Sequence, residues 1–217
     1  HGLPQQTAEM AQADLQQAID LEPEHISWYQ LTIEPNTAFF SAPPLLPEEE
    51  ILCDIQDAGQ ELLAANNFIQ YEVSAYARDN QRAKHNLNYW QFGDYLGIGA
   101  GANGKITLPE TEQIFRIWKT RLPQHYLAAV ADNEVPRFSL HKNSFLGGGD
   151  ILDQASLPLE FMMNALRLNA GVPKEFFNQR TGLDCSVIEK IWMELVAKGL
   201  VENNKDQLFN TIEQVFN

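Results

Sequence analysis

The residues best suited to chemistry begin at His85. Its imidazole can bind a metal, and the aromatic residues Tyr89 and Trp90 follow within the next five positions. If residues 85–90 are helical, the four-residue spacing places His85 and Tyr89 on one face. An imidazole beside apolar rings suits an axial ligand of haem, because the macrocycle can pack against the rings. A hydrogen-bonded structural histidine among core aromatic residues fits the same pattern, so both interpretations stay open.

A glycine-rich stretch follows, with glycines at Gly97, Gly99, Gly101 and Gly104. Missing side chains would let a bulky flat ligand approach the end of a strand, or would permit a bulge or a barrel corner. The last three glycines also match Gly-x-Gly-x-x-Gly, but a β-rich run follows them where a dinucleotide site needs a helix. Dinucleotide binding is therefore disfavoured.

The first 76 residues predict an α/β fold. This fold would position His85 and the glycines that follow it. An amphipathic helix over 7–21, with Thr7 as its N-cap, precedes a run at 26–33 that resembles a strand buried on both faces. A second helix, from 47 to about 65, precedes a second strand at 71–76. We expect two consecutive units of a parallel sheet or partial (β/α) barrel.

The next segment continues this first domain, which we place at residues 1–134. It contains a strand over 95–99, a hairpin of 105–107 with 114–118, and a short helix over 124–132. Residues 135–155, with three consecutive glycines, are predicted to form a connector.

Residues 156–217 predict a small winged-helix-like α+β domain. We expect three helices, at 159–168, 174–179 and 186–197. A two-stranded wing, formed by residues 200–202 and 207–209, should follow them. Residues 155–217 contain six basic and eight acidic side chains, whereas a DNA reader is normally basic. A packing or lid role is favoured over DNA binding.

Composition narrows the function further. The 217 residues are 44% hydrophobic and carry 15 basic against 29 acidic side chains, for a net charge of −14. This charge disfavours nucleic acid or an anionic membrane as the main partner. No apolar run of about 18 residues and no signal pattern occur, so we expect a soluble, cytoplasmic protein. Cys53 and Cys185, far apart in helical patterns, are predicted to be packing residues.

Several motifs together resemble one family, the HemW branch of the radical S-adenosylmethionine proteins, relatives of oxygen-independent coproporphyrinogen III oxidase. The chemical segment carries the pattern His-Asn-x-x-Tyr-Trp, followed by Gly-Ile-Gly-Ala-Gly-Ala. The other matching segments lie at 1–4, 27–37, 70–76 and 161–168. The resemblance covers nearly the whole chain.

The resemblance implies a partial barrel that carries a [4Fe-4S] cluster and S-adenosylmethionine, followed by a small C-terminal domain. This sequence departs from the family because it has no Cys-x-x-x-Cys-x-x-Cys cluster motif, which we expect upstream. We therefore expect the chain to be the later part of a radical S-adenosylmethionine barrel plus the C-terminal domain. It should be inactive alone in radical chemistry.

The resemblance also implies site roles. His85 would bind haem iron beside Tyr89 and Trp90, and the glycines at Gly97, Gly99 and Gly101 would border the cofactor space. Gln30, Leu31 and Thr32 would face the S-adenosylmethionine region. The implied function is to bind haem and to transfer it to haem-requiring proteins. The alternatives are radical oxidative decarboxylation of coproporphyrinogen III and, as a non-enzymatic class, a winged-helix regulator.

Overall fold

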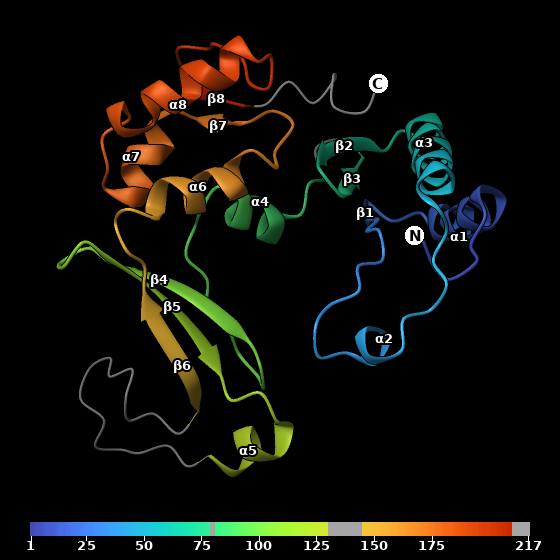
Figure 1. Cartoon of the computed structure of the whole chain (residues 1–217), viewed down its shortest axis with the longest axis horizontal. Helices are drawn as coiled ribbons and strands as arrows, with labels where there is room; N and C mark the ends of the chain where they lie inside the picture. The colour runs from blue at the N-terminus through green and yellow to red at the C-terminus, as the bar shows by residue number, and fades with distance from the viewer. Residues whose placement is uncertain (79–80, 130–144, 210–217) are drawn as a thin grey trace. The chain divides into compact units, whose positions relative to one another are not determined.

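The computed structural model describes residues 1–78, 81–129 and 145–209, and the chain divides into two compact units (Figure 1). They are His1–Lys84 and His85–Asn217, and each is described here by itself. Helices and strands are mixed in both units, which confirms a mixed α/β fold. None of the helices in these ranges has the length and apolar character that spanning a bilayer requires.

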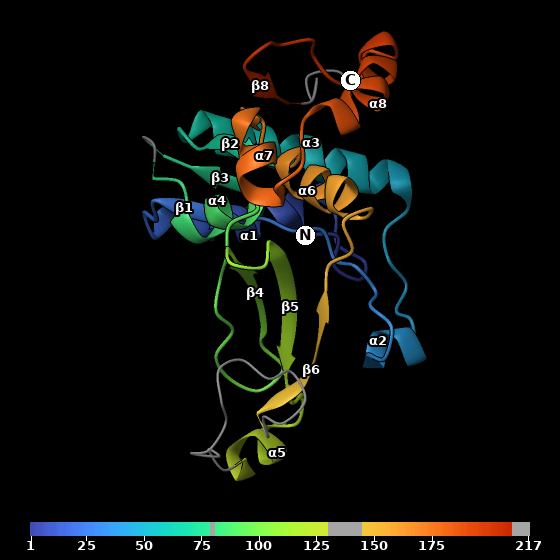
Figure 2. The same ribbon diagram turned by 90° about the vertical axis from the view of Figure 1, so that its left-hand side faces the viewer.

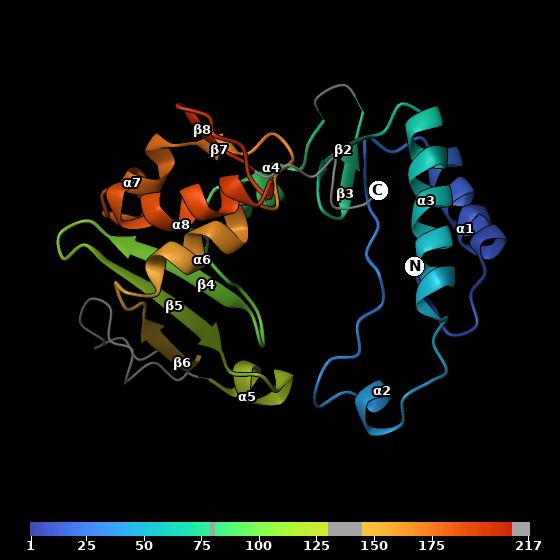
Figure 3. The same cartoon turned by 45° about the horizontal axis from the view of Figure 1, so that its top comes forward.

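Two long helices dominate the first unit, and both lie where the sequence predicts them. Helix α1 (Ala8–Asp20) begins after Thr7, whose hydroxyl accepts a hydrogen bond from the Met10 amide at 3.3 Å. Helix α3 (Glu49–Ala65) has acidic residues in its first turn, where they oppose the positive end of the helix dipole. The two helices pack side by side (Figure 3), and a short helix α2 (Ala38–Ser41) lies in the loop that precedes α3.

The sheet of the first unit differs from the prediction. Strands β1 (His25–Ser27), β2 (Ile69–Glu72) and β3 (Ala75–Ala77) have the order β1-β3-β2, and both pairs are antiparallel. The strand expected over 71–76 is wrong because a tight turn splits it into β2 and β3. As a result β1 and β2 run in the same direction, but β3 lies between them. The expected parallel neighbours are therefore wrong.

Strand β1 is also shorter than predicted, since it ends at Ser27 and not at residue 33. The Trp28 amide donates to the Ser74 carbonyl at 2.8 Å, and beyond it the chain leaves the sheet. The apolar character of this run comes partly from Trp28 itself, which packs on the core between the sheet and the helices. The core residues are Leu15, Ile19, Ile26, Leu63, Phe68 and Tyr76.

Helix α3 packs through Ile55, Gly59 and Leu63, which are buried. Cys53 lies on another side of the helix and is exposed, so its predicted packing role is wrong. Gly59 makes room for Trp28, because a Cβ atom there would lie 1.8 Å from the Trp28 Cη2 atom.

Substituting Gly59→Ala should therefore destabilise the first unit. In an open helix the same change stabilises by about 1 kcal/mol, through the helix propensity of alanine. Here the indole must move, and overpacking of this kind costs about 1–3 kcal/mol. Urea unfolding followed by tryptophan fluorescence measures the change. A gain in stability would show that Trp28 does not pack on this face of α3.

The second unit contains an antiparallel sheet of β4 (Asn103–Leu108), β5 (Gln113–Lys119) and β6 (Leu146–Ile151), in that order (Figure 2). The β4–β5 hairpin confirms the prediction, and helix α5 (Pro123–Ala128) follows it. The strand predicted over 95–99 is wrong, because only a single bridge, between Tyr95 and Lys105, forms there.

The predicted connector over 135–155 is partly wrong, because it contains β6. The three consecutive glycines predict a linker, but in the structure they leave room for a side chain. A Cβ atom at Gly148 would lie 2.4 Å from the Trp118 Cζ2 atom. Residues 135–144 lie outside the described part of the chain. The proposed domain limits, 1–134 and 156–217, stay a prediction, whereas the compact division falls between Lys84 and His85.

The last segment forms three helices where they were predicted: α6 (Leu157–Ala165), α7 (Glu175–Thr181) and α8 (Ser186–Ala197). The wing is different, because β8 (Gln207–Leu208) pairs with β7 (Val172–Pro173). A single hydrogen bond of 3.3 Å, from the Glu202 amide to the Phe209 carbonyl, joins the two expected arms of the wing. The winged-helix comparison therefore stays a prediction.

Candidate functional site

The predicted chemical residues begin on helix α4 (Lys84–Trp90). The His85 and Tyr89 rings are one turn apart on it, with centroids 4.9 Å apart, so the predicted shared face is confirmed. Tyr89 in turn stacks on Tyr95, with centroids 4.1 Å apart and planes inclined by 27°. We call His85, Tyr89 and Tyr95 the aromatic row. Its histidine is exposed and its tyrosines are half-buried, so the imidazole is accessible to a ligand.

The chemistry of the row differs between its members. Burial, followed by the hydrogen bond with Tyr95 and the proximity of that phenol, raises the pKa of Tyr89. Tyr89 is therefore a neutral phenol at physiological pH and not a tyrosinate. Neutral imidazole is a common axial ligand of haem iron, so His85 is the member of the row best suited to coordinate iron.

Trp90 is next to the row but is oriented toward another element. Its ring centroid is 6.1 Å from that of Tyr89, and the Arg167 guanidinium carbon lies 4.3 Å above the Trp90 ring. This cation–π contact fastens α4 to the residues that follow α6. Trp90 thus has a structural function in addition to the ligand contact predicted for it.

The loop after α4 is held by an ion pair that the sequence analysis missed. The Asp94 carboxylate accepts hydrogen bonds from the Lys105 ammonium at 2.8 Å and from the Thr107 amide at 2.8 Å. Lys105 is buried, donates also to the Phe92 carbonyl at 3.0 Å, and lies over the Phe92 ring. Because Tyr95 follows Asp94 directly, this network fixes Tyr95 against Tyr89.

The two charges of this pair affect each other. Burial alone would raise the pKa of Asp94, but hydrogen bonds from Lys105 and Thr107 outweigh it, and the net shift is downward. Burial lowers the pKa of Lys105, and Asp94 opposes that shift. Asp94 is consequently a carboxylate at neutral pH, and the charge of Lys105 is matched by it.

Substituting Asp94→Asn should cost about 1–2 kcal/mol of stability at pH 7, toward the low end for charged hydrogen bonds because the carboxylate is 42% exposed. The pKa of Asp94 is lower in the folded protein than in the unfolded chain, where it is about 4. The stabilisation by the Asp94 carboxylate is therefore fully present above about pH 4 and is lost as the pH falls through the pKa of the folded protein. Urea unfolding of both proteins between pH 3 and 7 measures the difference. Asp57→Asn, which removes an exposed carboxylate of α3, is the control and should lose less stability at pH 7 than Asp94→Asn.

The glycines serve different purposes. A Cβ atom at Gly97 would lie 2.1 Å from the Asn103 carbonyl oxygen, so Gly97 is required by backbone packing. Gly99 and Gly101 have φ values of +105° and +71°, which favour glycine, and a Cβ atom at either would find little around it. Strand β4 and not a helix follows Gly101, as the sequence predicts, which agrees with the argument against a dinucleotide site.

The residues Gln30, Leu31 and Thr32 lie in the first unit, on the loop after β1. The Leu31 amide donates to the His1 carbonyl at 2.8 Å, and the side chains of Gln30 and Thr32 are exposed. The aromatic row belongs to the second unit. Their predicted place near S-adenosylmethionine stays a prediction.

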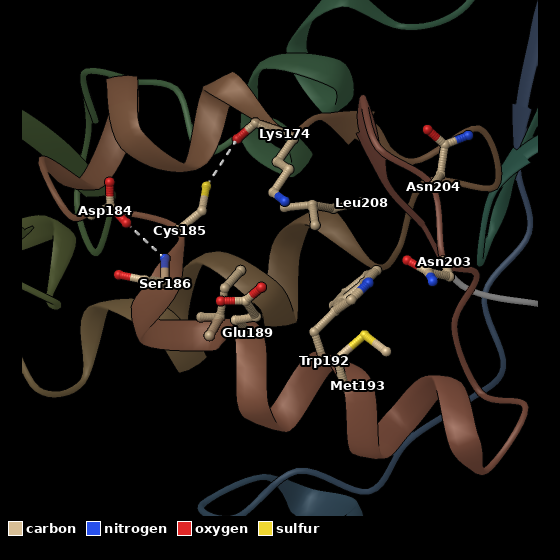
Figure 4. Close-up of a pocket in the computed structure, with 11 residues that line it drawn as sticks. Lys174, Asp184, Cys185, Ser186, Glu189, Trp192, Met193, Asn203, Asn204 and Leu208 are labelled. Carbon is tan, nitrogen blue, oxygen red and sulfur yellow. Dashed lines mark hydrogen bonds between the residues drawn. The ribbon is translucent and has the colours of Figure 1, made fainter.

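A polar pocket of ≈ 240 Å³ lies in the second unit, between the start of α8 and the turn before β8 (Figure 4). The Asp184 carboxylate accepts a hydrogen bond from the amide of Ser186, the first residue of α8, at 2.8 Å, and the Cys185 thiol donates to the Lys174 carbonyl at 3.7 Å. Burial raises the pKa of the Cys185 thiol, which keeps it neutral. These contacts stabilise the helix and identify no ligand.

An iron–sulfur cluster does not fit this chain. Such clusters are held mainly by cysteine thiolates, usually four, and the sequence has only two cysteines, Cys53 and Cys185. Within the described ranges, no group of three or more His, Cys, Asp or Glu residues is placed to hold a metal ion.

Comparison with known proteins identifies relatives over most of the chain. A family model described as the HemN C-terminal domain matches residues 152–211. Heme chaperone HemW of Escherichia coli is 44% identical over 206 residues, which are 95% of this chain and 50% of that protein. Heme chaperone HemW of Haemophilus influenzae is 46% identical over 94% of this chain and 49% of its own length.

A mouse protein and a solved structure extend this result. The mouse "Radical S-adenosyl methionine domain-containing protein 1, mitochondrial" is 38% identical over 92% of this chain and 46% of its own length. The structure of E. coli coproporphyrinogen III oxidase (HemN), a radical SAM enzyme, matches 97% of this chain and 50% of its own with a TM-score of 0.65. At 17% identity that likeness concerns the fold alone. The chain spans about half the length of the relatives it matches.

Proposed function

Because this chain belongs to the HemW-type family of HemN-like proteins, we propose that the complete protein binds haem as its cargo and transfers it to haem-requiring proteins. The observation that carries the proposal is the exposed His85 imidazole, held on α4 beside the stacked tyrosines of the aromatic row. Two relatives of more than 40% identity are named as heme chaperones, which supports the same interpretation.

In this proposal His85 coordinates the haem iron and Tyr89 packs against the macrocycle. The neutral Tyr89 phenol suits this packing because an anion beside the apolar ring would be costly to desolvate. Trp90, stacked under Arg167, keeps α4 in position. A site that coordinates iron through one exposed imidazole suits cargo that must be released.

The complete protein would also use a [4Fe-4S] cluster and S-adenosylmethionine, with Gln30, Leu31 and Thr32 facing the latter. The cysteines for that cluster would come from outside this sequence, since this chain lacks them. The cytoplasm is the expected location, and the haem-requiring proteins that receive the cargo are the expected partners.

The competing function is the oxidative decarboxylation of coproporphyrinogen III, which the likeness to the HemN fold brings into consideration. The reconstituted full-length protein decides between the two. We expect it to bind haem in a stoichiometric complex and to leave coproporphyrinogen III unchanged under anaerobic, reducing conditions with S-adenosylmethionine. Multiple turnovers to protoporphyrinogen would overturn the proposal in favour of the oxidase.

A further inference from the structure

A second cavity of the second unit, which we call the basic pocket, lies where β5 ends and α5 begins. Its volume is ≈ 520 Å³, within the range of small-molecule sites. The residues that matter for the argument are Gly101, Trp118, Lys119, Arg121, His125 and Gly147.

The charge of the pocket is opposite to that of the chain. Lys119, Arg121 and His125 line it, and no acidic residue is among its described lining residues. In the described part of the chain, none of the three forms a salt bridge. In a protein with a net charge of −14, the charges of Lys119 and Arg121, with no carboxylate among the described lining residues, favour an anionic ligand.

The pocket also has an apolar surface. The Trp118 ring lies against Gly147 and Gly148, where a Cβ atom would be only 2.9 Å and 2.4 Å from it, and Trp118 is 37% exposed. Leu122 adds a second exposed apolar side chain. An indole surface next to cationic groups suits a ligand with a flat apolar body and negative charges at its edge.

The backbone of the pocket is preorganised. The Gly101 amide donates to the Thr120 carbonyl at 2.9 Å, and the Lys119 amide donates to the Ala102 carbonyl at 2.8 Å. The Thr120 amide donates to the Phe145 carbonyl at 3.0 Å, which ties the start of the third sheet strand to the same point. Three segments are thus fixed around the cavity, so little conformational entropy of the backbone would be lost when a ligand binds.

From these observations we propose that the basic pocket binds the carboxylate edge of a planar tetrapyrrole. Lys119 and Arg121 would pair with its two propionates, His125 would donate a hydrogen bond, and the macrocycle would lie against Trp118. The inference rests on the proposed haem cargo but names a different set of residues from His85. It also assigns a role to Gly101, which borders this pocket.

Metal-free protoporphyrin IX is the probe, because without iron it gains nothing from coordination by His85. It is titrated into the 217-residue chain and followed by porphyrin fluorescence and tryptophan quenching. We expect Arg121→Gln and Lys119→Gln each to weaken binding about three- to tenfold, and the double variant more strongly. Lys190→Gln, which removes an exposed cation on α8, should leave the affinity unchanged.

Four further outcomes decide the proposal. A dimethyl ester of the porphyrin, which lacks the two charges, should bind equally to the wild type and to the double variant. Equal binding of the free acid to all variants would overturn the pocket assignment while leaving the His85 proposal intact. Tighter binding of ATP, with the same dependence on Arg121 and Lys119, would overturn the tetrapyrrole as the ligand. If protoporphyrin IX binds but haem shows no Soret change typical of iron coordination, the result would support the pocket assignment and contradict the haem-cargo function.

Discussion

Replacing His85 with alanine should weaken haem binding to this chain by at least about tenfold and should move the Soret maximum toward that of free haem. The reason is that His85 is the exposed imidazole of the aromatic row, while burial and Tyr95 keep Tyr89 a neutral phenol that is a poor replacement ligand. Mutation of a residue that only hydrogen-bonds to a metal ligand lowers metal affinity about 10–100-fold, so removal of the ligand itself should lower the affinity at least as much. The measurement is a titration with haemin followed by absorption.

The matched control is His125→Ala, on α5 of the same unit, where the histidine is also exposed. That variant should keep the Soret position of the wild type, because the iron ligand is unchanged, even where its affinity falls a few-fold. Identical spectra and affinities for His85→Ala and the wild type would contradict the ligand assignment. So would loss of the wild-type Soret position in His125→Ala alone.

Replacing Phe161 with alanine should cost about 3–5 kcal/mol of stability, the range for removal of a fully buried phenylalanine ring. Phe161 is 0% exposed, and its ring meets Phe92 at 5.7 Å and Phe177 at 5.3 Å between centroids. It therefore joins the loop after α4 to α7. Urea unfolding measures the loss, and near-ultraviolet circular dichroism should show a weaker aromatic signal as Phe92 loses its support.

Met163→Ala tests whether the loss of stability in Phe161→Ala is due to the burial of the side chain that is removed. Met163 lies on the same helix, α6, but is 66% exposed, so its loss should change stability by less than about 0.5 kcal/mol. Similar losses for the two variants would show that Phe161 does not occupy the centre of this core.

The sequence could predict the part of the site that depends on local spacing. His85 and Tyr89 are four residues apart on a helix, and that spacing alone brings their rings together. Tyr95 and the Asp94–Lys105 pair could not be found in this way, because they meet only when the loop after α4 folds back onto β4. No pattern of residue types marks such a contact in a single sequence.

The fold shows the same limit. Helices α1, α3 and α8 follow their apolar periodicity and were predicted within one or two residues of their ends. Strand β6 was read as a linker because its glycines are typical of one, whereas they are present to admit the Trp118 indole. Strands β2 and β3 are not separated in the prediction, because the turn between Glu72 and Ala75 lies inside the run 71–76, which predicts a single strand.

The central claim, that the complete protein carries haem to other proteins, is tested most directly by a transfer experiment. Full-length protein loaded with haem is mixed with a haem-free acceptor, and the acceptor's own Soret spectrum is followed over time. We expect haem to reach the acceptor faster than it is released to a small-molecule scavenger, and we expect the His85→Ala protein to load and deliver little. Transfer no faster than spontaneous release, or transfer unchanged by His85→Ala, would contradict the account.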